Sequence, residues 1–163
     1  MGTERDREFT DYVVRRRDAL RRAAYLLCRD PYAADDLVQT AVTRLYLAWP
    51  RARRADSIDA YAHTVLVRVY VDEHRRGWWR VRLVDREPDR PRHQPDLEGR
   101  LDLRDALAVL TPHQRAVLVL RYYRDFSIEQ TADALGCSAG TVKSQTSRAL
   151  AALRRALAPE TRS

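Results

Sequence analysis

The feature that most restricts the fold of this chain is a polar, proline-rich stretch near its middle. Residues 85–95 have the sequence DREPDRPRHQP, with three prolines and no apolar residue. Such a segment cannot join a packed core and is typical of a linker. We therefore expect a first domain at residues 9–82, a linker at 83–98 and a second domain at 99–158. Each part is small for a domain that is stable alone, so docking on a larger partner would help.

Both parts are predicted to be helical, which makes the fold class all-α with two small domains. Alanine, leucine and arginine dominate the composition, and glycine occurs only five times. No alternating apolar pattern is long enough to indicate a strand. Ala, Leu and Arg are strong helix formers, so composition and pattern agree.

The first part contains three expected helices. Asp30 and Pro31 suit the start of the second helix, Pro50 suits its end, and either Ser57 or Asp59 caps the third, which ends near Gly77. The helices span about residues 9–28, 31–49 and 57–77, with a basic loop at 51–56. Their apolar stripes are Val13, Leu20, Ala24 and Leu27; Ala34, Val38, Ala41, Val42, Leu45 and Trp49; and Tyr61, Val65, Leu66 and Val69.

The second part starts near Leu97 and has clear helix boundaries. Residues 111–114 (TPHQ) and 127–130 (SIEQ) each fit a capping box, in which a hydroxyl and an amide three residues later bond each other's backbone. Gly136 is placed to end the helix that begins at Ser127, and a last helix follows Ser138 as far as Leu157. The remaining apolar positions are Leu101, Ala106, Leu107 and Leu110 of a short helix, and Val117, Leu118, Leu120 and Tyr123 of the next.

Residues 127–150 have the spacing of a helix-turn-helix, centred on the turn Gly136-Cys137-Ser138. Ile128, Ala132, Leu135, Val142 and Leu150 would fix the angle between the two helices. The second helix would then present polar and cationic groups that suit phosphate and base edges. These residues are Thr141, Lys143, Ser144, Gln145, Ser147 and Arg148. The alternative is a helical hairpin with a solvated face, but residues 139–157 contain no carboxylate, whereas solvated helices usually mix charges of both signs.

The net charge of +7 agrees with a polyanionic partner, although a bias of the genome toward arginine would produce it too. Lys143 is the only lysine. Cys28 and Cys137 form no CxxC pair and do not cluster with histidine, so we expect no metal, no cofactor and no disulfide framework. The charged start and the lack of a long apolar run indicate neither a signal peptide nor a membrane span. We expect a cytoplasmic protein.

The two halves resemble, in order, two regions of one family. The sequence LTPHQRAVLVLRYYRDFSIEQTADALGCSAGTVKSQTSRALAALRRAL is similar to region 4 of sigma-70-type factors, especially the extracytoplasmic-function (ECF) group. DPYAADDLVQTAVTRLYLAWPRA resembles region 2.2 of that family, and YAHTVLVRVYVDEHRR resembles regions 2.3 to 2.4. The resemblance covers roughly residues 9–157. It implies a sigma factor that binds core RNA polymerase, a sigma region 2 domain at 9–82 and a sigma region 4 domain at 99–158.

The resemblance also implies roles for individual residues. The region 2.2 helix would bind the polymerase through Asp35, Asp36, Leu37, Gln39, Thr40 and Thr43. An acidic first turn also favours the helix dipole, which would explain Asp35 and Asp36 without a partner. The loop and helix that open and hold the −10 element would use Arg53, Arg54, Asp56, Ser57, Arg68, Asp72, Arg75 and Arg76. The duplex −35 element would be contacted by Lys143, Ser144, Ser147 and Arg148.

Two segments keep more than one interpretation. Residues 74–82 place four arginines beside Trp78 and Trp79, which suits unwound DNA, but a tryptophan there could equally close the core of the first domain. The linker would, by analogy, enter the active-site channel of the polymerase. Arg154 and Arg155 could reach phosphate or simply favour the helix dipole.

The leading hypothesis is a bipartite promoter-recognition protein that acts only with core polymerase, while an anti-sigma partner would hold it inactive. A conventional helix-turn-helix regulator would instead bind a palindromic site without polymerase. An enzyme acting on nucleic acid would need clustered carboxylates or metal ligands, and no such cluster is recognisable. We expect no enzymatic activity, no membrane contact and no small-molecule substrate.

Overall fold

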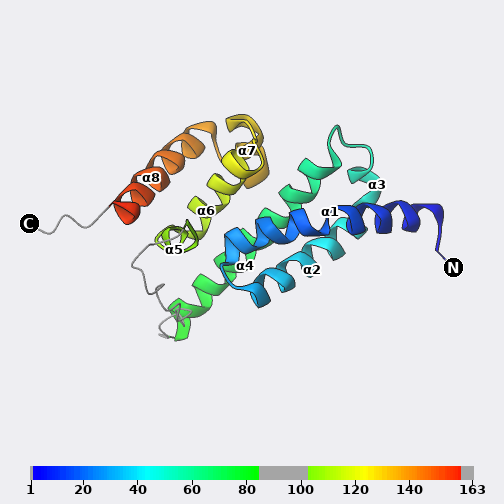
Figure 1. Cartoon of the computed structure of the whole chain (residues 1–163), viewed down its shortest axis with the longest axis horizontal. Coiled ribbons are helices and arrows are strands. Elements are labelled where there is room, and N and C mark those ends of the chain that lie inside the picture. The colour runs from blue at the N-terminus through cyan, green and yellow to red at the C-terminus, as the bar shows by residue number, and fades with distance from the viewer. Residues whose placement is uncertain (1, 85–102, 159–163) are drawn as a thin grey trace, which may run out of the picture. The chain divides into compact units, whose positions relative to one another are not determined.

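The computed structural model describes residues 2–84 and 103–158, and within these ranges it contains helices and no strand (Figure 1). The all-α fold is thus confirmed. The chain divides into two compact units, of which the first comprises residues 1–70 and the second begins at Val71. The predicted linker at 83–98, the start near Leu97 and the position of Leu101 fall wholly or largely outside the described residues. So do the side chains of Trp78 and Trp79.

In the first unit, α1 (Glu4–Cys28) packs along α2 (Pro31–Leu47). The first helix begins five residues before the predicted Phe9, because Thr3 and Asp6 form a capping box. The Thr3 hydroxyl accepts from the Asp6 amide at 3.3 Å, and the Asp6 carboxylate accepts from the Thr3 amide at 3.2 Å. The predicted cap of the second helix is confirmed, since the Asp30 carboxylate accepts from the amides of Tyr32 and Ala33.

Two boundaries in the first half of the chain differ from the prediction, and a third was left open between two residues. Helix α2 ends at Leu47, and Pro50 lies in the first turn of a short α3 (Trp49–Ala52), where a proline needs no amide partner. Helix α4 runs from Ile58 to Val84 and continues through Gly77, because one glycine weakens a helix without breaking it. Ser57, not Asp59, caps α4, and its hydroxyl accepts from the Ala60 amide at 3.1 Å.

The core of the first unit is built from the predicted stripes, with additions. Leu20, Leu27, Leu45, Trp49 and Leu66 are almost completely buried. In α4, Tyr61 and Val65 are only half-buried, while the fully buried positions include Ala62, His63, Val67 and Tyr70. The buried face of α4 is therefore rotated relative to the predicted stripe.

In the second unit, α8 (Ala139–Leu157) packs on α5 (Leu103–Leu107), α6 (Pro112–Leu118) and α7 (Ile128–Leu135). Both predicted capping boxes are present, at Thr111 with Gln114 and at Ser127 with Gln130. A π-helical turn, η1 (Val119–Tyr123), follows α6 and was not predicted. The turn is closed by the Phe126 amide, which donates to the Leu120 carbonyl at 2.8 Å.

Candidate nucleic-acid interface

Helices α7 and α8 form a helix-turn-helix in which a hydroxyl caps the start of each helix and a glycine ends the first. The Ser127 hydroxyl accepts from the Gln130 amide at 3.0 Å, and the Ser138 hydroxyl accepts from the Thr141 amide at 3.1 Å. Gly136 ends α7 in the left-handed conformation with φ of 65°, a geometry that glycine adopts without strain. The two helices meet on a buried cluster of Val117, Ala132 and Val142, with Ile128, Leu135 and Cys137 packed against it.

The predicted −35 face lies on the first half of α8. Lys143, Ser144, Ser147 and Arg148 are exposed, whereas Thr141 and Gln145 are half-buried. The Thr141 hydroxyl lies 2.9 Å from that of Ser138 and so belongs to the helix cap as much as to the surface. The exposed residues form a cationic surface that has no carboxylate on its own helix, which suits a polyanion.

A second basic surface surrounds the loop between α3 and α4. Arg53, Arg54, Asp56 and Ser57 are all exposed, as predicted residues of a DNA-facing loop should be. A hollow of about 370 Å³ lies beside the loop. Its walls come from α1, the loop and the first turn of α4, and they include Arg15, Arg16, Arg53, Asp56 and Asp59.

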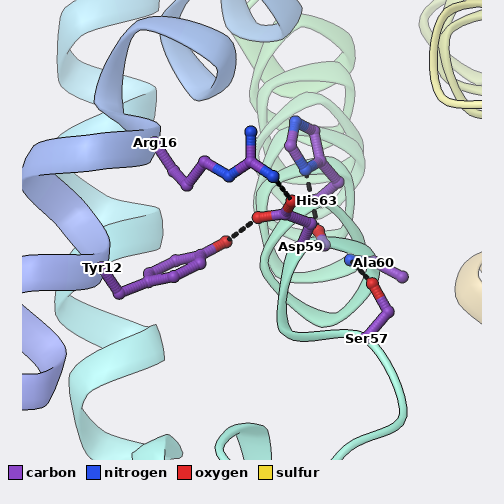
Figure 2. Close-up of polar contacts among 6 residues, drawn as sticks. All are labelled: Tyr12, Arg16, Ser57, Asp59, Ala60 and His63. Carbon is purple, nitrogen blue, oxygen red and sulfur yellow. Dashed lines mark hydrogen bonds and ion pairs between the residues drawn. The ribbon is translucent and has the colours of Figure 1, made fainter.

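The first turn of α4 is tied to α1 through Asp59. The Tyr12 hydroxyl donates to one Asp59 oxygen at 2.8 Å, and the Arg16 guanidinium forms an ion pair with the other (Figure 2). Nδ1 of the buried His63 lies 2.8 Å from the Asp59 main-chain carbonyl oxygen. At the start of the loop, Arg53 pairs with Glu8 of α1 at 3.2 Å.

Glu8, Tyr12 and Arg16 were not predicted as part of the site. Their spacing of four residues, which places them on one helix face, was the signal available in the sequence. It could not reveal their partners, because Tyr12 and Asp59 are 47 residues apart.

The exposed side of α4 carries the other predicted −10 residues. Arg68, Asp72, Arg75 and Arg76 are all exposed. Asp72 follows Arg68 by four residues and precedes Arg75 and Arg76 by three and four, so the four lie along one side of the helix. Three of these four side chains are cationic, as a face along a nucleic-acid backbone requires.

The predicted polymerase-binding face on α2 is partly exposed. Asp35, Asp36, Gln39 and Thr43 are exposed, and Thr40 is half-buried. Leu37 is the exception: it is only 1% exposed and belongs to the core, because it lies on the stripe of α2 that also carries Ala34 and Leu45. Its placement on a binding face is therefore corrected.

The α2 face is also partly engaged within the chain. Asp35 forms an ion pair with Arg21 of α1 at 2.9 Å. The hydroxyls of Thr40 and Thr43 donate to carbonyls one turn earlier, at 3.0 and 2.9 Å. Of the exposed side chains on this face, Asp36 and Gln39 are therefore the best placed to meet a partner.

Within residues 2–84 and 103–158, no group of three or more His, Cys, Asp or Glu side chains could hold a metal ion. Cys28 and Cys137 form no disulfide bond, and burial raises the pKa of the Cys137 thiol. None of the described helices is long and apolar enough to cross a membrane.

Comparisons with known proteins place both halves of the chain in one family. Residues 12–80 match the model of sigma-70 region 2, and residues 100–153 match that of sigma-70 region 4. The RNA polymerase sigma-E factor of Streptomyces coelicolor is 41% identical over 157 residues, which cover 92% of this chain and 86% of that protein.

More distant relatives agree. The ECF RNA polymerase sigma factor SigL of Mycobacterium tuberculosis is 35% identical, over 82% of this chain and 79% of its own. The sigma factor RpoE of Bartonella quintana, solved in complex with the anti-sigma factor NepR, superposes with a TM-score of 0.74 at 27% identity, covering 94% of this chain and 98% of that one. The chain therefore belongs to the sigma-70 family, in the ECF group of RNA polymerase sigma factors.

Proposed function

We propose that this sigma factor divides promoter recognition between its two units. The helix-turn-helix unit binds duplex DNA at −35 through Lys143, Ser144, Ser147 and Arg148, with Thr141 and Gln145 at the edge of the contact. Region 2, which includes the face of α4 as far as Arg76, holds the melted −10 strand. We assign region 2 to residues 9–82, preceded by the extra turn of α1 from Glu4, and region 4 to residues 99–158, with 83–98 between them.

The observation that carries the −35 assignment is the α8 surface. Its cations are exposed on a helix whose position is fixed by two capped helices and a buried apolar cluster. A rigid helix with short polar side chains and no carboxylate suits entry into the major groove. The guanidinium of Arg148 and the ammonium of Lys143 can pair with phosphate or guanine.

For −10 capture, the supporting observations are the exposed arginines of the loop, the hollow beside them, and the face of α4 with Arg68, Asp72, Arg75 and Arg76. Separated strands need cations along the backbone and a recess for an unstacked base. Arg53, Asp56 and Ser57 line one side of such a recess, and Arg54 is exposed in the same loop.

Core polymerase binds, in this proposal, to the exposed side of α2 with Asp35, Asp36, Gln39, Thr40 and Thr43. The complex of the Bartonella quintana relative with NepR supports an anti-sigma partner for this chain as well. We further propose that the chain catalyses no reaction itself and works in the cytoplasm, where polymerase and promoter meet. Increasing concentrations of an anti-sigma protein should progressively reduce the transcription that depends on this sigma factor.

The test is transcription in vitro by purified core polymerase, with and without this protein, on promoter fragments that include the promoter of its own gene. Run-off transcripts that require the protein are expected. Lys143→Ala and Arg148→Ala should each weaken binding of the holoenzyme to −35 DNA and lower the slope of log K against log salt by about 0.9 per lost phosphate contact.

Arg17→Ala is the matched control, because Arg17 is exposed on α1 and lies on none of the proposed faces. It should leave the salt slope unchanged. If the protein neither bound core polymerase nor changed initiation, but bound a palindromic DNA site alone, the bipartite assignment would be wrong.

A further inference from the structure

Three side chains of α1 point to a role that the proposed DNA contacts do not cover. Glu8, Tyr12 and Arg16 are spaced by four residues and so form one stripe of the helix. All three contact the segment around the exposed loop, although it lies more than 40 residues further along the chain. Glu8 holds Arg53 at 3.2 Å, and Tyr12 and Arg16 both hold Asp59 (Figure 2).

These contacts fix the loop at its two ends. Arg53 is the first loop residue after α3, and Asp59 lies just inside α4, directly behind the cap Ser57. The intervening residues Arg54 and Asp56 remain exposed. The ties therefore restrain the backbone of the loop without covering the side chains that would face DNA.

Asp59 is the stronger of the two anchors. Its side chain is only 20% exposed and accepts from Tyr12 as well as pairing with Arg16, which is 50% exposed. Glu8 and Arg53 are each more than 40% exposed and have only each other in this contact. Partial burial strengthens an ion pair, and exposed pairs contribute little. A carboxylate in the first turn of α4 is also favoured by the helix dipole.

An anchored loop binds DNA with a smaller loss of conformational freedom than a free one. The same stripe also helps to build the hollow, since Arg16 and Tyr12 lie in its wall together with Arg53 and Asp56. We propose that Glu8, Tyr12 and Arg16 form an α1 clamp that positions the loop of residues 53–57 for capture of the −10 strand. This rests on the proposed −10 role of the loop.

The experiment uses the full-length protein bound to core polymerase, on a promoter identified by run-off transcription. Tyr12→Phe removes one hydroxyl and keeps the buried ring, and Asp59→Asn removes the charge that Arg16 pairs with. Arg54→Ala alters the loop itself, and Arg17→Ala is the control. Three quantities are measured for each variant: the affinity for core polymerase, the midpoint of thermal unfolding, and the fraction of promoter opened, from permanganate reactivity of unpaired thymines.

Tyr12→Phe should lower promoter opening about threefold to tenfold, the usual net effect of one lost hydrogen bond. Asp59→Asn should lower it by about tenfold or more. Affinity for core polymerase should stay within about twofold of the wild type, because the α2 face is untouched. Arg16→Lys, which keeps the cation, should retain more opening than Arg16→Ala.

Each other result has a distinct meaning. If Arg54→Ala abolishes opening while Tyr12→Phe and Asp59→Asn match the wild type, the clamp is refuted and the −10 role of the loop stands. If Arg54→Ala also has no effect, the proposed −10 role fails, and the clamp with it. If the Asp59 and Tyr12 variants lose core affinity and thermal stability in parallel with opening, their role is structural, and the clamp is again refuted.

Discussion

Replacement of Val142 by alanine should loosen the helix-turn-helix without disturbing the first unit. Val142 is fully buried and joins α8 to Val117 of α6 and Ala132 of α7. Two buried methyl groups contribute about 1.6 kcal/mol by transfer alone. The cavity adds on the order of 1 kcal/mol, and the better helix propensity of alanine returns about 0.5 kcal/mol. The expected loss in the free energy of unfolding is therefore about 2 kcal/mol.

Peptide-resolved hydrogen exchange measures this loss locally, which matters in a chain of two units. A loss of about 2 kcal/mol raises the exchange rate of amides protected by opening of that unit about 30-fold. We expect this increase in peptides from α7 and α8, and no change in peptides from α2. Binding to −35 DNA should weaken as well, because the cationic face depends on the position of α8.

Val109→Ala is the matched control, since Val109 belongs to the same unit but is 55% exposed. It should change stability by less than about 0.5 kcal/mol. The cluster does not hold the two helices together if the exchange rate in α7 and α8 rises less than about threefold in Val142→Ala. The same conclusion follows if the rate rises equally in both variants.

Three further predictions concern local features. Gly136→Ala should cost about 1 kcal/mol of stability in thermal unfolding, entirely from the backbone, because φ is +65° and no atom lies within 4 Å of an added Cβ. Ser127→Ala removes a capping hydroxyl and should cost about 1 kcal/mol in urea unfolding, while Ser127→Asn should cost much less. The hydroxyl of Tyr46 donates to Asp6 at 2.9 Å and holds the pKa of Asp6 below its ordinary value of 3.8. The stabilisation from this bond is present above the ordinary pKa of Asp6 and is lost as pH falls through the lowered pKa. Tyr46→Phe should therefore raise the pKa of Asp6 in an NMR titration, and an unchanged pKa would contradict the bond.

The pKa of the Tyr46 phenol shifts in the direction opposite to that of Asp6, which agrees with a hydrogen bond between the two side chains. Its bond to Asp6 raises the pKa of Tyr46. The ring of Tyr46 also meets Phe9 edge-on, with centroids 5.1 Å apart. These contacts attach the first turns of α1 to α2, and they explain why the helix is longer at this end than the apolar stripe predicts.

Local chemistry let the sequence determine most of the second unit. A capping box needs only residues three apart, and a glycine at the end of a helix needs only its own φ, so Thr111, Ser127 and Gly136 could be placed without knowledge of the fold. Four of the predicted apolar anchors of the helix-turn-helix, Ile128, Ala132, Leu135 and Val142, followed from helical spacing alone. The order of the two family resemblances is likewise a property of the linear sequence and needs no tertiary contact.

The tertiary structure decided what depends on distant partners. The sequence placed Leu37 on a polymerase-binding face, but packing of α2 on α1 buries it. The sequence left open whether Ser57 or Asp59 caps α4, because both side chains can cap a helix. Tyr12 and Arg16 decide it, since they hold the Asp59 carboxylate from 47 and 43 residues away in the chain. Helical periodicity states which residues share a face, whereas the partner of that face depends on how the chain folds back, and no local pattern contains that information.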